Sequence, residues 1–110
     1  MPRYLVQATY TPEAWAAMLK NPQDRNEIVA PLLERLGGRF ESAYLAFGEH
    51  DVVAIAELPD KVSAAALSMI TSAGGAVKAV KTTPLLTVDE GLAAMRKGAE
   101  VGGSYRPPTA

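Results

Sequence analysis

Residues 37–60 read GGRFESAYLAFGEHDVVAIAELPD and contain two strand-like runs, Arg39–Phe47 and Val52–Leu58. The first run mixes aromatic, small and charged residues, whereas the second is apolar apart from Glu57. An almost continuous apolar run is typical of a central strand that is covered on both faces. The four residues between the runs, Gly48-Glu49-His50-Asp51, form a connection short enough for an antiparallel hairpin.

The segment before this hairpin predicts a strand followed by two helical pieces. Arg3–Tyr10 is rich in β-formers, and Thr11 followed by Pro12 is a helix-start pattern for a helix that reaches Lys20. Asn21–Asp24 interrupts the helix because its proline restricts the backbone. The second piece keeps an apolar stripe until Gly37-Gly38, where a left-handed stop is expected; Pro31 is expected to kink this piece or to begin its last part.

The segment after the hairpin repeats the pattern of helix and strand. Pro59 ends the strand, and Asp60 is positioned to cap a helix over 61–73 that Gly74-Gly75 terminates. Residues 76–86 predict a fourth strand, with Pro84 at a bulge or on an edge. Thr87 to Glu90 is a capping-box pattern that opens a short helix through Leu92, Met95 and Arg96.

The predicted order is therefore β-α-β-β-α-β with an added C-terminal helix, which is an α+β, ferredoxin-like arrangement. Its four-stranded antiparallel sheet would carry helices on one face only. Because Leu5, Tyr44 and Val53 place apolar side chains on both pleats, we expect the bare faces of two sheets to pack together in a homodimer or a higher even-numbered oligomer. The predicted domain covers residues 1–97, and 98–110, rich in glycine and proline, is expected to be a flexible tail.

Composition excludes several classes of function. The 110 residues have a formal net charge of −1 with interspersed signs, so no basic stripe for nucleic acid is expected. The absence of cysteine excludes disulfides and thiolate chemistry. No apolar run approaches the roughly 20 residues of a membrane helix, and no signal-peptide pattern opens the chain, so a cytoplasmic protein without membrane contact is expected.

The run from Gly37 to Asp60, together with the strand over 2–11 and the segment over 82–90, resembles the GYD-domain family across about residues 2–97. The resemblance implies a fold similar to dimeric α/β-barrel proteins, whose paired sheets enclose a cavity used by monooxygenases, isomerases, haem enzymes and effector-binding domains. It implies no established activity of the family itself. One position departs from the motif, because His50 stands where a tyrosine usually precedes the aspartate.

Candidate catalytic residues gather in the hairpin. His50 is the only histidine, and an imidazole exchanges protons near neutral pH. Asp51 is expected to orient it or to shape the turn through backbone hydrogen bonds, and Tyr44 is a candidate donor. Because successive residues of a strand face opposite ways, His50 and Asp51 need not touch.

Candidate ligand-binding residues are Gln7, Thr9, Tyr44 and Trp15. Gln7 and Thr9 share one pleat of the first strand, and alternation along the second places Tyr44 on the same face as Phe40 and Ser42. In a dimer these polar groups would line an otherwise apolar cavity for a small organic molecule, or they would only hydrogen-bond the partner. Trp15 is expected to pack or to form the rim of a pocket.

No metal or cofactor is expected, since a single histidine without cysteine makes a poor ligand set and a hairpin is an unsuitable place for a haem ligand. Three functions remain open. The first is cofactor-free acid or base chemistry in a dimer cavity, resembling that of an isomerase or a monooxygenase. The second is the sensing of a metabolite without turnover, and the third is a structural or assembly role.

Overall fold

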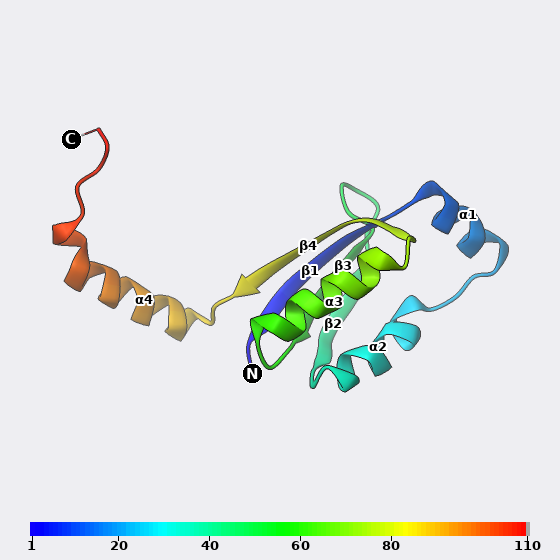
Figure 1. The fold of residues 1–110 in the computed structure, drawn as a ribbon, viewed down its shortest axis with the longest axis horizontal. Coiled ribbons are helices and arrows are strands. Elements are labelled where there is room, and N and C mark those ends of the chain that lie inside the picture. The colour runs from blue at the N-terminus through cyan, green and yellow to red at the C-terminus, as the bar shows by residue number, and fades with distance from the viewer. Residues whose placement is uncertain (110) are drawn as a thin grey trace.

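The computed structural model describes residues 1–109 and shows an α+β fold built on one sheet (Figure 1). The strands follow the order β2-β3-β1-β4, and every neighbouring pair is antiparallel. The predicted α+β class and the predicted succession of strands and helices are confirmed. The elements are β1 (Arg3–Tyr10), α1 (Pro12–Lys20), α2 (Arg25–Arg35), β2 (Arg39–Leu45), β3 (Val52–Glu57), α3 (Lys61–Ala73), β4 (Val77–Leu85), α4 (Val88–Val101) and the 3-10 turn η1 (Gly102–Ser104).

The predicted helix starts are confirmed by side-chain caps. The Thr11 hydroxyl accepts a hydrogen bond from the Ala14 backbone, and the Asp60 carboxylate accepts one from Ser63. Thr87 and Glu90 form the reciprocal bonds of a capping box. These contacts satisfy backbone donors that the first helical turn leaves without partners.

The buried core lies between one face of the sheet and helices α2 and α3. Tyr4, Ala56 and Leu58 meet Leu33 of α2 and the α3 residues Ala64 and Leu67 in this cluster. Figure 1 shows both helices on the same side of the sheet. We call this side the covered face, and we call the opposite side the open face because no helix among residues 1–109 packs on it.

A β-bulge in β2 overturns the predicted pleat of this strand. Phe40 lies opposite Ala56, but Ser42 lies opposite Ile55, so Glu41 is inserted between two consecutive pairs. Residues that are directly opposed in an antiparallel pair share a face. Phe40 therefore faces the core while Ser42 and Tyr44 point to the open face, and the prediction that all three share one face was wrong because the inserted residue reverses the alternation.

Pro84 lies on β4, an edge strand that pairs with β1 alone, in agreement with the predicted edge position. β2 ends at Leu45, two residues before the predicted Phe47. The helix that follows Asp24 runs without interruption through Pro31, whose side chain is exposed.

Helix α4 extends away from the sheet at the end of β4 (Figure 1). None of its residues is buried, and the molecule measures 59 × 33 × 22 Å along its principal axes. The helix passes Gly98 and ends at Val101, within the segment predicted to be a tail without structure. An isolated glycine lowers helix stability by only about 1 kcal/mol, so the turns that follow the capping box continue through it. Ala110, the end of the predicted tail, lies outside the described residues.

Candidate functional site

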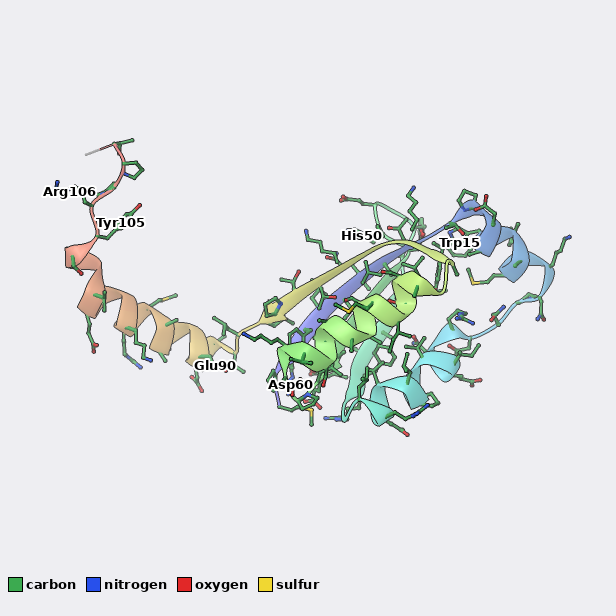
Figure 2. The ribbon with its side chains drawn as sticks, viewed as in Figure 1. Trp15, His50, Asp60, Glu90, Tyr105 and Arg106 are labelled. Atoms are coloured by element: carbon green, nitrogen blue, oxygen red, sulfur yellow. The ribbon has the colours of Figure 1, made fainter. Side chains whose placement is uncertain are left out.

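The β2–β3 connection is fixed against the end of β1 by backbone hydrogen bonds. The Ala46 N–H donates to the Asp51 carbonyl over 2.8 Å, and the Asp51 N–H donates to the Ala8 carbonyl over 2.8 Å. His50 lies at this end of the sheet, as does Trp15 on α1 (Figure 2). The connection thus has a defined position relative to β1 and α1.

The Asp51 carboxylate joins β1 to α1. Its Oδ2 accepts the Tyr10 backbone N–H at 2.9 Å and the Trp15 indole Nε1–H at 3.3 Å. The indole also packs edge-on against the Tyr10 ring, with centroids 5.4 Å apart. From the sequence we expect Asp51 to orient His50 or to shape the turn, whereas the observed contacts link the carboxylate to the backbone of β1 and to the first helix.

His50 meets Thr9 and not Asp51 among the hydrogen bonds of residues 1–109. The His50 Nδ1 lies 3.4 Å from the Thr9 hydroxyl oxygen, which is also 3.5 Å from the Glu49 carbonyl oxygen. The imidazole is half-buried. A threonine hydroxyl, rather than a carboxylate, is therefore the side chain placed to orient the imidazole.

The open face brings together four of the six predicted site residues. Gln7 lies opposite Val53, and Val53 lies opposite Tyr44, so Gln7 and Tyr44 are separated by two strand spacings, about 10 Å. Thr9 follows on the same pleat of β1, and His50 contacts it from the connection. Tyr44 is 71% exposed.

Tyr44 also borders the cavity next to Trp15, but Trp15 itself lies apart from Gln7, Thr9 and His50. It lies on the side of the covered face, where it lines a cavity of about 540 Å³ beneath the α1–α2 connection. The structure thus divides the predicted site, with Gln7, Thr9, Tyr44 and His50 at the open face and Trp15 bonded to Asp51 behind it.

The other end of the open face carries an ion-pair network that was not predicted. Glu57, only 8% exposed, binds Arg39 Nε at 2.6 Å and Arg3 Nη2 at 3.3 Å. Arg3 Nε also bonds Glu41 at 2.6 Å, and the Glu41 carboxylate raises the pKa of Arg3 above its ordinary value. The single charge in the otherwise apolar third strand was the signal for this network.

A second cavity, of about 260 Å³, lies between α2, α3 and the covered face of the sheet. It shares Tyr10, Arg25, Asn26 and Val52 with the cavity beside Trp15. Burial raises the pKa of the Tyr10 phenol, while the nearby Arg25 guanidinium acts in the opposite direction. The phenol is therefore protonated at neutral pH.

Within residues 1–109 no three histidine or acidic side chains come together as a metal site. In the same range, no helix has the length and apolar character required to cross a membrane.

Comparison with known proteins gives one family. The family model described as GYD domain matches residues 4–95. Neither the curated proteins nor the solved structures contain a match.

Proposed function

The chain belongs to the GYD domain family, and we propose that it binds a small organic molecule between the open faces of two sheets in a homodimer. The observation that carries this proposal is the centre of the open face. Leu5, Val53 and Ile55 are half-buried by their strand neighbours, and no element of residues 1–109 covers them. Antiparallel sheets that face water on one side normally place polar residues there, so an apolar centre indicates a second surface.

The distribution of side chains along the open face supports a ligand site at one end. An ion-pair network occupies the opposite end and pairs two positive with two negative charges, those of Arg3, Arg39, Glu41 and Glu57. Gln7, Thr9 and Tyr44 offer hydrogen-bonding groups next to the apolar centre. A largely apolar enclosure with a few placed polar groups is the usual form of a small-molecule site.

Catalysis at this site would depend on His50. In the proposed reaction the imidazole transfers a proton to or from the bound molecule, and the Tyr44 hydroxyl donates a hydrogen bond to it. Loss of turnover in His50→Ala with retained ligand binding would support this step. Retained turnover would refute it.

Metabolite sensing without turnover is the second candidate. It is favoured by the contacts of Asp51, whose Oδ2 accepts two donors from β1 and α1, so that the residue is committed to the scaffold. Binding without turnover in the wild-type protein, and unchanged binding in His50→Ala, are the results expected of a sensor.

The dimer is tested by placing a charge on the open face. Val53→Asp is expected to give a folded monomer, because a carboxylate at this position would be buried between two apolar surfaces without a partner. Val62→Asp is the matched control, since Val62 on α3 is 72% exposed. Native mass spectrometry should report dimers for the wild type and the control. A monomeric wild type, or a dimeric Val53→Asp variant, would refute the open face as the interface.

The same spectra test the ligand. A non-protein mass retained by the wild-type dimer and lost from the Val53→Asp monomer would support a site between the sheets. A mass that stays with the monomer would place the ligand elsewhere, and a dimer that remains empty after exposure to candidate acids and carbonyl compounds would favour an assembly function.

A further inference from the structure

The cavity between α2 and α3 is a gap in the packing of the covered face. Both helices contact the sheet, yet Ile28 of α2 and Ile70 of α3, which line the cavity, remain 53% and 45% exposed. Its floor is formed by short side chains, Ala8 of β1 and Ala54 of β3 among them. The cavity opens to solvent between the two helices, so its volume of about 260 Å³ is accessible to a molecule from outside.

The walls of this cavity are apolar over most of their surface, and the polar groups lie at one end. Val6, Val29, Leu32 and Phe40 belong to the apolar part. Tyr10, Arg25 and Asn26 form the end that is shared with the cavity beside Trp15. The arrangement is amphipathic in the way that a molecule with an apolar tail and a polar head would need.

The charged side chains that line the cavity indicate which kind of head group it would bind. The lining of the cavity includes Arg25 and no acidic residue. The guanidinium donates from Nη1 to the Gln23 side-chain oxygen at 3.0 Å and also interacts with the Tyr10 phenol. A guanidinium carries five N–H donors, so donors remain for a ligand. The neighbouring carboxylates already accept hydrogen bonds within the protein. Asp24 caps α2 by accepting the Asn26 backbone N–H, and Asp51 accepts the Tyr10 backbone N–H and the Trp15 indole N–H.

We propose that this cavity binds an apolar organic acid, with the tail between α2 and α3 and the carboxylate at Arg25 and the Tyr10 hydroxyl. A guanidinium and a protonated phenol are both donors, and hydrogen bonds to a charged carboxylate are stronger than those between neutral groups. If each non-hydrogen atom takes roughly the 30 Å³ of a water molecule, the cavity holds about nine of them, the size of a medium-chain fatty acid or a small aromatic acid. This site lies on the other side of the sheet from the open face, so it does not depend on the proposed dimer.

Ligand binding to this cavity can be measured by the fluorescence of Trp15. It is the only tryptophan, it packs against Tyr10, and it lines the adjoining cavity. Its fluorescence would be titrated with octanoate and, as the uncharged counterpart, with 1-octanol. We expect saturable binding of octanoate at least about tenfold tighter than that of octanol, as a charge-assisted contact gives.

Substitutions at Arg25 and Ile28 test the binding of the head group and of the tail separately. Arg25→Gln should reduce octanoate affinity to the level of octanol and leave octanol unchanged, whereas Arg25→Lys, which keeps the charge, should retain part of the preference. Ile28→Asn should weaken both probes, and Met69→Asn, at an exposed position of α3 that lines neither cavity, should weaken neither. Circular dichroism would verify that each variant is folded.

The titration would be repeated with the Val53→Asp variant, in which the open face cannot close over a ligand. Octanoate binding that persists there supports the cavity between the helices, and binding that disappears overturns it. The proposal is also overturned if neither probe saturates, if octanol binds as tightly as octanoate, or if Arg25→Gln binds octanoate as the wild type does.

Discussion

Replacing Asp51 with alanine is expected to lower the free energy of unfolding by about 2–4 kcal/mol. The carboxylate accepts the Tyr10 N–H at 2.9 Å, and a hydrogen bond to a charged group contributes about 1.5–3 kcal/mol. The Trp15 contact at 3.3 Å is longer than the usual limit of about 3.2 Å, so its contribution should be nearer half of that. Alanine removes the oxygen that accepts both bonds and leaves two half-buried donors without a partner. Asp51→Asn, which keeps an acceptor oxygen, should cost about 1 kcal/mol.

Urea unfolding followed by far-ultraviolet circular dichroism would measure these changes for Asp51→Ala, Trp15→Phe and the double variant. If the carboxylate holds α1 through the indole, Trp15→Phe should cost less in the Asp51→Ala background, with a coupling of at least about 0.5 kcal/mol. The reasoning is refuted if Asp51→Ala costs less than about 1 kcal/mol, or if the two substitutions are additive.

Three further outcomes are expected. Gly38→Ala should destabilise the protein by at least about 3 kcal/mol in the same urea assay, because a Cβ there would overlap the Glu57 carbonyl oxygen and come within 2.8 Å of Leu58; Gly48→Ala, which meets nothing within 4 Å, should stay within about 0.5 kcal/mol. Hydrogen bonds from Ser63 lower the pKa of Asp60, so its contribution to stability is present above the unfolded-state pKa of about 3.9 and is lost as pH falls through the lower folded value; unfolding measured from pH 6 to pH 2 should lose part of its acid dependence in Asp60→Asn, and an unchanged profile would count against the cap. In the Val53→Asp monomer, hydrogen exchange should be far faster in α4 than in α3, because a 14-residue helix without tertiary contacts is marginally stable; equal protection would show that α4 is covered.

Local chemistry explains what could be predicted from the sequence. The bounds of β1 and α3 agree with the prediction, since Thr11, Asp60 and the Gly74-Gly75 pair mark their ends through short-range contacts. The same is true of the capping box at Thr87. Each of these features depends on residues within a few positions of one another, so a single sequence contains the necessary information.

The bulge at Glu41 had no such signal. One type of bulge is marked in a sequence by a glycine with positive φ, but here the inserted residue is a glutamate whose side chain binds Arg3 of another strand. That partner is 38 positions away, so the register of β2, and with it the side to which Tyr44 points, depends on a tertiary contact.

The contacts and the cavity on the covered side of the sheet also could not be predicted from the sequence. The bond from Trp15 to Asp51 spans 36 positions, and the cavity at Arg25 depends on how far α2 and α3 lie apart on the sheet. Spacing along the chain places Trp15 on a helix, but it does not indicate which carboxylate the indole will reach.

His50 and Asp51 are adjacent in the chain, but at the end of β1 they make contacts on different sides of the sheet. The Thr9 hydroxyl meets the imidazole on the open side, whereas the Asp51 carboxylate accepts the Tyr10 backbone N–H and the indole N–H of Trp15, which lies on the covered side. His50 therefore contributes an imidazole to the open face, and Asp51 anchors α1. Substitutions at these two adjacent positions consequently perturb separate properties: His50 affects the proposed dimer site, and Asp51 affects the wall of the cavity between the helices.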